Sequence, residues 1–185
     1  MKCLLNGKDR LMCPYGHLTI VTAQEGDPCR HTPLLRLTGS QDRIIWESVL
    51  KGLEENSLSE NVTADTCDFG AVVSSAGKYV VFAGNTRTLS VDLNSGAVLD
   101  ASDVSQTNSS LDVLALYEFS IGISVMISAK TIVVFGGNGS VRLTKSLSAP
   151  IASIIEVNQK GVKYSRYDID NPDLAEREEY VSFEA

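Results

Sequence analysis

Residues that could bind a metal gather at the N-terminal end of the chain. Both histidines and three of the four cysteines fall within the first 31 residues. Thiolate sulfur and imidazole nitrogen are the ligands that Zn²⁺ prefers in tetrahedral sites. The sequence therefore allows a zinc site made of Cys13, His17, Cys29 and His31, although the spacings Cys-x3-His and Cys-x-His differ from those of a standard zinc finger. The alternative is that these cysteines are small buried apolar residues and that the histidines lie in loops.

Other catalytic arrangements have little support in the sequence. No Gly-x-Ser-x-Gly motif precedes either histidine, so a serine nucleophile of the hydrolase type is not indicated. A cysteine beside a histidine could form a thiolate pair, which leaves an enzyme or a zinc protein built on the N-terminal cluster as an alternative. We expect a protein without catalytic residues and without a cofactor other than this possible zinc.

The charge of the chain is acidic and unevenly distributed. The net charge is -7, and residues 44–120 and 164–185 hold most of the acidic side chains. A general nucleic-acid binder needs clustered Lys and Arg, so direct nucleic-acid binding is not expected. An acidic face could dock a basic protein, or the acidic and basic segments could simply be neighbours in the fold. Under the docking hypothesis the contact residues are Asp65, Asp68, Asp100, Asp103, Asp112, Glu176, Glu178 and Glu179.

The middle of the chain contains an internal repeat of β character. Residues 75–85 and 128–138 match at seven of eleven positions without a gap. Each copy is a β-branched run that ends in Phe and then Gly-Asn, and each continues into a second alternating run. This pattern predicts two hairpins of the same kind, because Gly and Asn tolerate the positive φ of tight turns.

The stretch from Ala71 to Leu99 resembles a blade of a WD40-type β-propeller. The likeness rests on residues 77–81 and 89–96, with Val91-Asp92 where the family usually has Trp-Asp, and no Gly-His opens the blade. The resemblance implies a binding scaffold. A closed propeller needs at least four blades of about 40 residues, and only two or three fit after the first 60 residues. We therefore expect an open antiparallel β array, either half-propeller-like or a β-sandwich.

The two ends of the chain predict short helices. In residues 40–53 the apolar side chains recur at helical spacing, with Ser40 as the cap and Trp46 as an anchor that packs the helix on a sheet. Residues 171–180 could form a helix with Pro172 at its first position, or a loose acidic tail. Residues 151–157 and 162–167 are predicted strands.

Taken together, these patterns predict a mainly β protein with one or two short helices in a single domain, 1–185. It comprises an N-terminal Cys/His segment plus helix (1–60), the two-copy β repeat (61–150), and strands with an acidic tail (151–185). No apolar run approaches the roughly 20 residues of a spanning helix, so we expect a cytoplasmic protein without a membrane partner. The function expected is an acidic inhibitor, such as an immunity protein that neutralises a basic, nuclease-type toxin domain. A β scaffold subunit of a larger complex is a further alternative.

Overall fold

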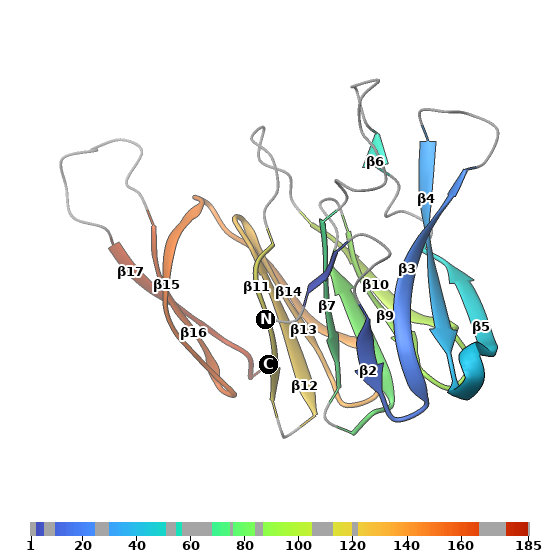
Figure 1. The fold of residues 1–185 in the computed structure, drawn as a ribbon. Helices are drawn as coiled ribbons and strands as arrows, with labels where there is room; N and C mark the ends of the chain where they lie inside the picture. The colour runs from blue at the N-terminus through green and yellow to red at the C-terminus, as the bar shows by residue number, and fades with distance from the viewer. Residues whose placement is uncertain are drawn as a thin grey trace.

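The computed structural model describes residues 3–5, 10–24, 30–50, 55–56, 68–74, 76–83, 87–104, 113–119, 122–166 and 177–184. These residues form four antiparallel sheets (Figure 1). The first sheet has the order β2-β3-β4-β5, with β6 paired to β4. Its strands are β2 (Leu11–Cys13), β3 (Gly16–Gln24), β4 (Arg30–Thr38), β5 (Ile44–Val49) and β6 (Glu55–Asn56). The second has the order β1-β7-β8-β9-β10, with strands β1 (Cys3–Leu5), β7 (Asp68–Val73), β8 (Tyr79–Ala83), β9 (Arg87–Asp92) and β10 (Val98–Asp103).

The four sheets lie side by side in a row, and the third and fourth sheets follow the second (Figure 1). The third has the order of its chain, with strands β11 (Val113–Phe119), β12 (Ile123–Ser128), β13 (Thr131–Phe135) and β14 (Val141–Ser146). The fourth consists of β15 (Ile151–Asn158), β16 (Gly161–Arg166) and β17 (Arg177–Ser182). None of the described sheets closes on itself, so the predicted mainly β, open antiparallel array is confirmed. Among the described residues no helix has the length and apolar character needed to cross a bilayer.

The hydrophobic core lies between the sheets, in three clusters. One joins the first and second sheets through Leu18, Leu37 and Phe82, among others. Another joins the second and third sheets, and the last joins the third and fourth. Because burying one such side chain contributes about 1.5–3 kcal/mol, face-to-face packing of neighbouring sheets is the main stabilising interaction of the array.

The central strands of the internal repeat are buried on both faces. Val80 and Phe82 of β8 face the first sheet, and their counterparts Val133 and Phe135 of β13 face the second sheet. The alternate residues of both strands face the next sheet along the row. Strands covered on both sides need continuous apolar sequence, which is why the repeat reads as an unbroken apolar run.

The two predicted hairpins are present, but they take different places in their sheets. β8 pairs with β9, and β13 pairs with β14, as predicted. However, β7 lies against β11 and β10 lies against β14, so the third sheet matches the second strand by strand from β7 onward. β8 is then the second strand of that set and β13 is the third. The sequence repeat is thus offset by one strand from the structural repeat.

Both helix predictions are wrong where the structure describes the residues. Residues 40–50 form a single turn, η1 (Ser40–Asp42), followed by β5. The β-branched residues Ile44, Ile45 and Val49 favour an extended strand, and pairing with β4 places Trp46 on the core side of the sheet. Residues 177–180 belong to β17, which pairs with β16 along its whole length, and residues 171–176 lie outside the described part of the chain.

Candidate functional site

The structure places the two histidines of the predicted zinc site far apart. His17 on β3 pairs with Thr38 of β4, whereas His31 lies seven residues earlier on β4 and pairs with Gln24. At roughly 3.3 Å per residue, the two backbone positions are about 23 Å apart along the hairpin. Cys29 lies outside the described residues. Within the described ranges, no group of three or more His, Cys, Asp or Glu residues could hold a metal ion.

Cys13 serves the packing of the first sheet. Its thiol is free and partly buried, and the side chain packs against the cluster between the first and second sheets. Its backbone pairs with Gly16 across the β2–β3 turn. The alternative interpretation from the sequence, a small apolar residue, therefore describes this cysteine.

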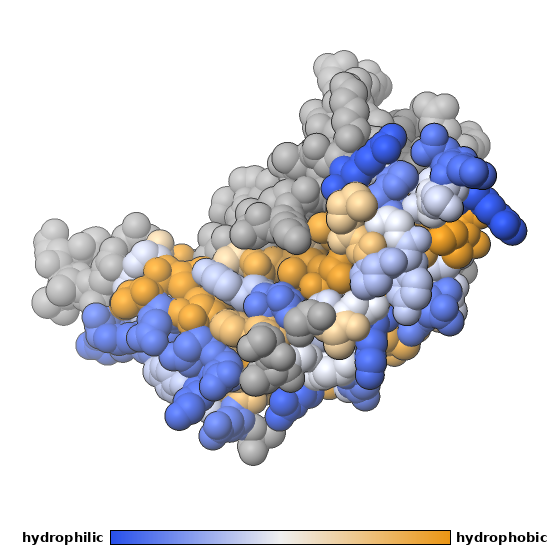
Figure 2. Space-filling view, turned by 60° about the horizontal axis from the view of Figure 1, so that its bottom comes forward, coloured by the Kyte–Doolittle hydropathy of each residue, from blue (hydrophilic) through white to orange (hydrophobic). Residues whose placement is uncertain are grey.

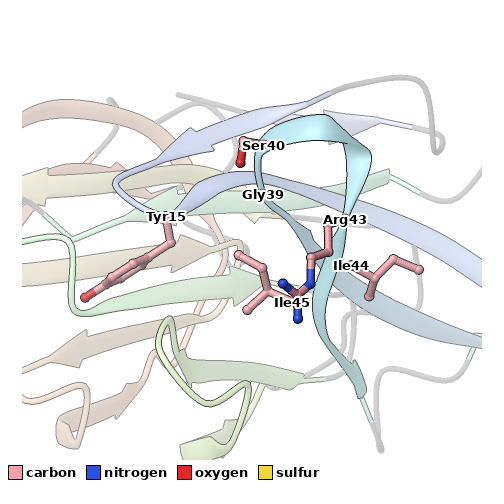
Figure 3. A pocket seen from close by; sticks show the side chains of 6 residues that line it. All are labelled: Tyr15, Gly39, Ser40, Arg43, Ile44 and Ile45. Carbon is pink, nitrogen blue, oxygen red and sulfur yellow. The ribbon is translucent and has the colours of Figure 1, made fainter.

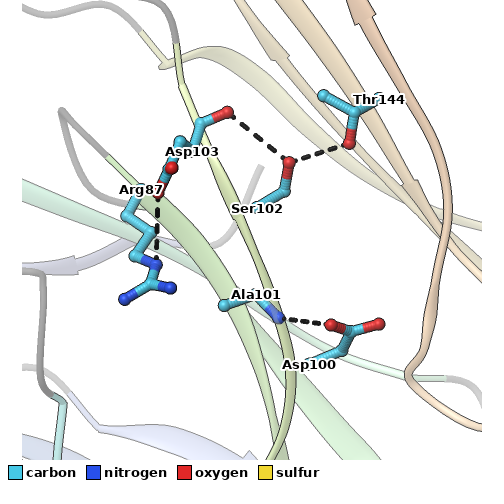
Figure 4. Close-up of polar contacts among 6 residues, drawn as sticks. All are labelled: Arg87, Asp100, Ala101, Ser102, Asp103 and Thr144. Atoms are coloured by element: carbon cyan, nitrogen blue, oxygen red, sulfur yellow. Dashed lines mark hydrogen bonds and ion pairs between the residues drawn. The ribbon is translucent and has the colours of Figure 1, made fainter.

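Asp100 has a structural role that its predicted place in a binding surface did not suggest. One carboxylate oxygen, Oδ2, accepts a hydrogen bond from the backbone N–H of Val141, 2.7 Å away on β14 of the third sheet. The β13–β14 ladder has a register shift beside Val141, which leaves this N–H available to a side chain. The other oxygen, Oδ1, accepts from the N–H of Ala101 (Figure 4). Asp100 thus connects two sheets.

Asp103 is the most exposed of the described acidic candidates. Its side chain is 90% exposed, and its carboxylate lies 3.4 Å from Nε of Arg87 (Figure 4). Its neighbour Ser102 shares a 2.8 Å hydrogen bond with Thr144 of β14, so β10 is held to the third sheet at a second point. Asp103 therefore keeps a charge in solvent at the end of β10, the strand that Ser102 holds against the third sheet.

The two described C-terminal acidic candidates, Glu178 and Glu179, face opposite sides of the fourth sheet. Glu178 forms an ion pair with Lys163 at the surface. Glu179 accepts hydrogen bonds from the hydroxyl of Tyr164, 2.7 Å away, and from Nε of Arg166. The bond from Tyr164 and the Arg166 charge lower the pKa of Glu179, and burial raises the pKa of Tyr164. Both carboxylates are therefore engaged within the sheet.

The eight acidic candidates do not form one described patch. Asp65, Asp112 and Glu176 lie outside the described residues, and Asp68 begins β7 without a described side chain. The remaining four occupy β10 of the second sheet and β17 of the fourth. What the structure shows instead is an apolar surface at the other end of the row, which sequence reasoning missed.

We call this surface the outer face of the first sheet. One strand-to-strand row holds Met12, His17 and Ile44, with the buried Thr38 between the last two, and another holds Leu34 and Val49. The Arg36–Glu47 ion pair lies between the two rows. Residues that alternate with these, such as Leu18, Leu37 and Trp46, point into the core. Met12 is 68% exposed and Ile44 48% exposed. Figure 2 shows hydrophobic residues at the surface near the right-hand end of the row of sheets, bordered by hydrophilic ones.

A pocket of about 390 Å³ opens at one end of the first sheet, between the β2–β3 turn and the start of β5. Its lining residues are Tyr15, Gly39, Ser40, Arg43, Ile44 and Ile45. In Figure 3, Ile45 lies between Tyr15 and Arg43, and Ile44 lies on the far side of Arg43. The pocket therefore combines an aromatic ring, aliphatic side chains and one cation.

The backbone beside this pocket is strained. Gln41 and Asp42 have φ values of 60° and 55°, a conformation that costs a residue with a side chain about 1–2 kcal/mol. Two such residues in succession turn the chain sharply, so that Arg43, Ile44 and Ile45 emerge at the sheet surface. A register shift in the β4–β5 ladder leaves Ile45 without a cross-strand partner. The adjacent isoleucines were the available sequence signal, and they were assigned to a helix.

Comparison with solved structures gives distant similarities, among them the following two. The chain is similar to a protein of unknown function from Bacteroides caccae, with 12% identity and a TM-score of 0.36 over 83% of this chain and 56% of that one. It is also similar to the WD40 domain of SCAP from fission yeast, with 11% identity and a TM-score of 0.35 over 94% of this chain and 44% of that one. The chain thus spans about half the length of these two structures. No protein family model and no curated protein matches it.

Proposed function

We propose that the protein is a non-enzymatic protein-binding module that docks its partner on the outer face of the first sheet. The observation that carries this proposal is the exposure of Met12, Ile44 and Val49 on one sheet face. Between neighbouring sheets the apolar faces cover one another. The fourth sheet, at the other end of the row, also exposes two large apolar side chains, Ile155 and Tyr180. Exposed large apolar side chains that gather on one sheet face, here around the Arg36–Glu47 ion pair, are a feature of protein interaction sites.

The propeller-like interpretation of the array is part of the same proposal. Asp92, which stands at the Asp of the WD40-like motif, accepts hydrogen bonds at Oδ1 from the N–H groups of Asn94 and Ser95 and so closes the β9–β10 turn. A propeller-like array without a catalytic site would act as a binding scaffold, in the cytoplasm, either alone or as a subunit of a larger complex. Fold likeness does not define the partner, which has to come from the docking surface.

The sharper form of the proposal is an acidic inhibitor, such as an immunity protein that neutralises a basic toxin domain. The net charge of -7 and the exposed carboxylate of Asp103 favour it, because an acidic surface speeds association with a basic partner. Asp100 and Glu179 are not suitable contact residues, since both already accept hydrogen bonds within the protein. Asp103 and Glu178 are the described candidates that remain.

Site-specific photocrosslinking in an extract of the protein's own host tests the module. A benzophenone amino acid placed at Val49 should yield one discrete crosslinked partner, and the matched probe at Leu99 on β10 should not. Both positions are exposed to the same extent, so reactivity is controlled. A chain that runs alone in native mass spectrometry and gives no crosslink at Val49 would contradict the proposal.

The inhibitor form of the proposal can be tested separately once a partner protein has been identified. Asp103→Lys should slow association several-fold at low salt and flatten its dependence on ionic strength, because steering acts on the association rate. A partner with an acidic surface, or an unchanged rate, would contradict the inhibitor form and leave the binding module intact.

A further inference from the structure

The strand β5 is an open sheet edge among the described strands. It pairs with β4 on one side, and no described strand pairs with its other side (Figure 1). The unpaired backbone N–H and C=O groups of an edge strand are a template on which an extended peptide can add. With six residues, β5 offers enough length for such pairing.

Four of the other described edge strands have features that oppose strand addition. β10 is held against β14 by the Asp100–Val141 and Ser102–Thr144 hydrogen bonds. β15 has two register shifts against β16, which twist a strand and interrupt its edge. β17 presents consecutive charged residues at its start, and β2 has only three residues. Bulges, charges and short length are the usual means of preventing strand addition. β5 has one bulge, at Ile45, and one charged residue, Glu47, which is paired with Arg36, so its edge remains a usable template.

The side chains of β5 are suited to an apolar neighbour. Ile44, Ile45 and Val49 are each between 43% and 49% exposed. The one charged residue within the strand, Glu47, is already paired with Arg36 of β4 at 2.6 Å. An added strand would therefore meet aliphatic side chains at both ends of β5 and a neutralised ion pair between them. Cross-strand contacts of this kind contribute most when both partners are β-branched or aromatic.

A single cation marks one end of this edge. Arg43 directly precedes β5, is exposed and lines the pocket. It forms no ion pair within the described ranges, although the exposed carboxylate of Asp42 is its neighbour in sequence. A guanidinium beside an apolar pocket favours a carboxylate on the partner, since Arg pairs with carboxylates in a bidentate geometry.

We propose that β5 binds an extended polypeptide segment as an added strand, with alternating apolar side chains against Ile44 and Val49 and an acidic side chain paired with Arg43. This proposal rests on the proposed function, and it specifies the chemistry of the partner segment. The pocket takes the side chain next to the acidic one. The acidic net charge of the protein then plays no direct role at this surface.

Peptide titration with purified protein tests the strand-addition proposal. The probe is a fluorescein-labelled ten-residue peptide that alternates valine and threonine and has two glutamates at each end, so that either strand direction offers an acid to Arg43. A second peptide has lysines in place of the glutamates, and a third has a central proline, which removes a backbone donor. Fluorescence anisotropy should show at least tenfold tighter binding of the glutamate peptide than of the other two.

Protein variants then locate the site. Arg43→Glu should reverse the preference between the glutamate and lysine peptides. Val49→Lys should weaken both, whereas Leu99→Lys on β10 serves as the matched control and should bind as the unaltered protein does. Circular dichroism of each variant confirms that it is folded.

Three results of the peptide titrations would each overturn the proposal. They are equal affinity for the glutamate and lysine peptides, unchanged binding by the proline peptide, and equal losses in Val49→Lys and Leu99→Lys. If sedimentation shows a dimer and Val49→Lys dissociates it, the segment that binds β5 would belong to a second copy of the chain, and the proposed acidic segment would be wrong. A partner crosslinked at Val49 without peptide binding would refute strand addition and leave the docking face in place.

Discussion

The indole Nε1 of Trp46 donates a hydrogen bond to the backbone carbonyl of Leu93, 3.0 Å away. Trp46 belongs to β5 of the first sheet, and Leu93 directly follows β9 of the second. The ring also packs against the core cluster between these sheets. One side chain thus joins two sheets through a contact between residues that are 47 positions apart in the sequence.

Trp46→Phe should lower the free energy of unfolding by about 1–2 kcal/mol. The aromatic ring is kept in part, but the carbonyl of Leu93 loses its partner in a partly buried place. Urea unfolding followed by circular dichroism measures this loss. Tryptophan fluorescence cannot be used, because Trp46 is the chain's one tryptophan and the variant lacks it. Tyr15→Phe, which changes an exposed ring on the same sheet, is the control and should leave the midpoint unchanged.

Gly96→Ala should destabilise the same contact from the other side. Gly96 has a φ of 74°, and a Cβ at this position would lie 2.7 Å from the ring of Trp46. Both the conformation and the clash are unfavourable, and together they should cost about 1–3 kcal/mol. Gly137→Ala, where the nearest atom to an added Cβ is 3.5 Å away, should cost much less.

A double-mutant cycle separates the two causes of the Gly96 effect. In a Trp46→Leu background the clash with the ring disappears, so Gly96→Ala should cost less than it does in the unaltered protein. Equal costs in both backgrounds would show that the backbone conformation alone is responsible.

Asp100→Ala should destabilise the protein by about 1–2 kcal/mol, because it leaves the N–H of Val141 without its acceptor. Asp103→Ala should cost no more than about 0.5 kcal/mol, because an ion pair with such an exposed carboxylate contributes little. Thermal or urea unfolding compares the two. A larger loss in Asp103→Ala would mean that the Arg87 contact, not the sheet-to-sheet hydrogen bond, matters at this strand.

Glu179→Gln should change the pH dependence of stability. The hydrogen bond from Tyr164 is the largest cause that lowers the pKa of Glu179, so the folded state favours the carboxylate. That contribution is complete above the ordinary range of a glutamate and is lost as pH falls through the lowered pKa. Because the side chain is partly exposed, we expect Glu179→Gln to cost about 1 kcal/mol at neutral pH.

At acid pH, below the lowered pKa of Glu179, the difference between Glu179→Gln and the unaltered protein should shrink, since both then hold a neutral side chain. Urea unfolding at the two pH values measures it. Glu178→Gln removes a surface ion pair with Lys163 and should have little effect at either pH. A Glu179→Gln cost that stays constant with pH would contradict the assigned role of the carboxylate.

Local sequence predicted the strands correctly wherever a strand is buried on both faces. Val80 to Phe82 and Val133 to Phe135 are apolar without interruption, and the structure places both runs at the centre of sheets. Local sequence predicted a helix in place of a strand where one face of the strand is open to solvent and a register shift breaks the alternation of apolar and polar residues. Ile44, Ile45, Trp46 and Val49 then mimic the spacing of a helix, and only pairing with β4 selects the strand.

The candidate sites show the same division for a different reason. His17 and His31 are close in sequence, but pairing of β3 with β4 places them at opposite ends of a hairpin. Asp100 reads as one more carboxylate among 23 acidic residues, and becomes a link between sheets only because a register shift on β14 frees the N–H of Val141.

The sequence by itself determined the β character of the chain, its buried repeat strands and its acidic charge, because side-chain shape, hydropathy and ionisation act over a few residues. The tertiary structure decided which strands share a sheet, which carboxylates are engaged and which face stays uncovered. Those outcomes depend on register and on packing between segments tens of residues apart, which local pattern does not encode. The exposed edge at β5 belongs to this second group, and with it the proposed docking surface.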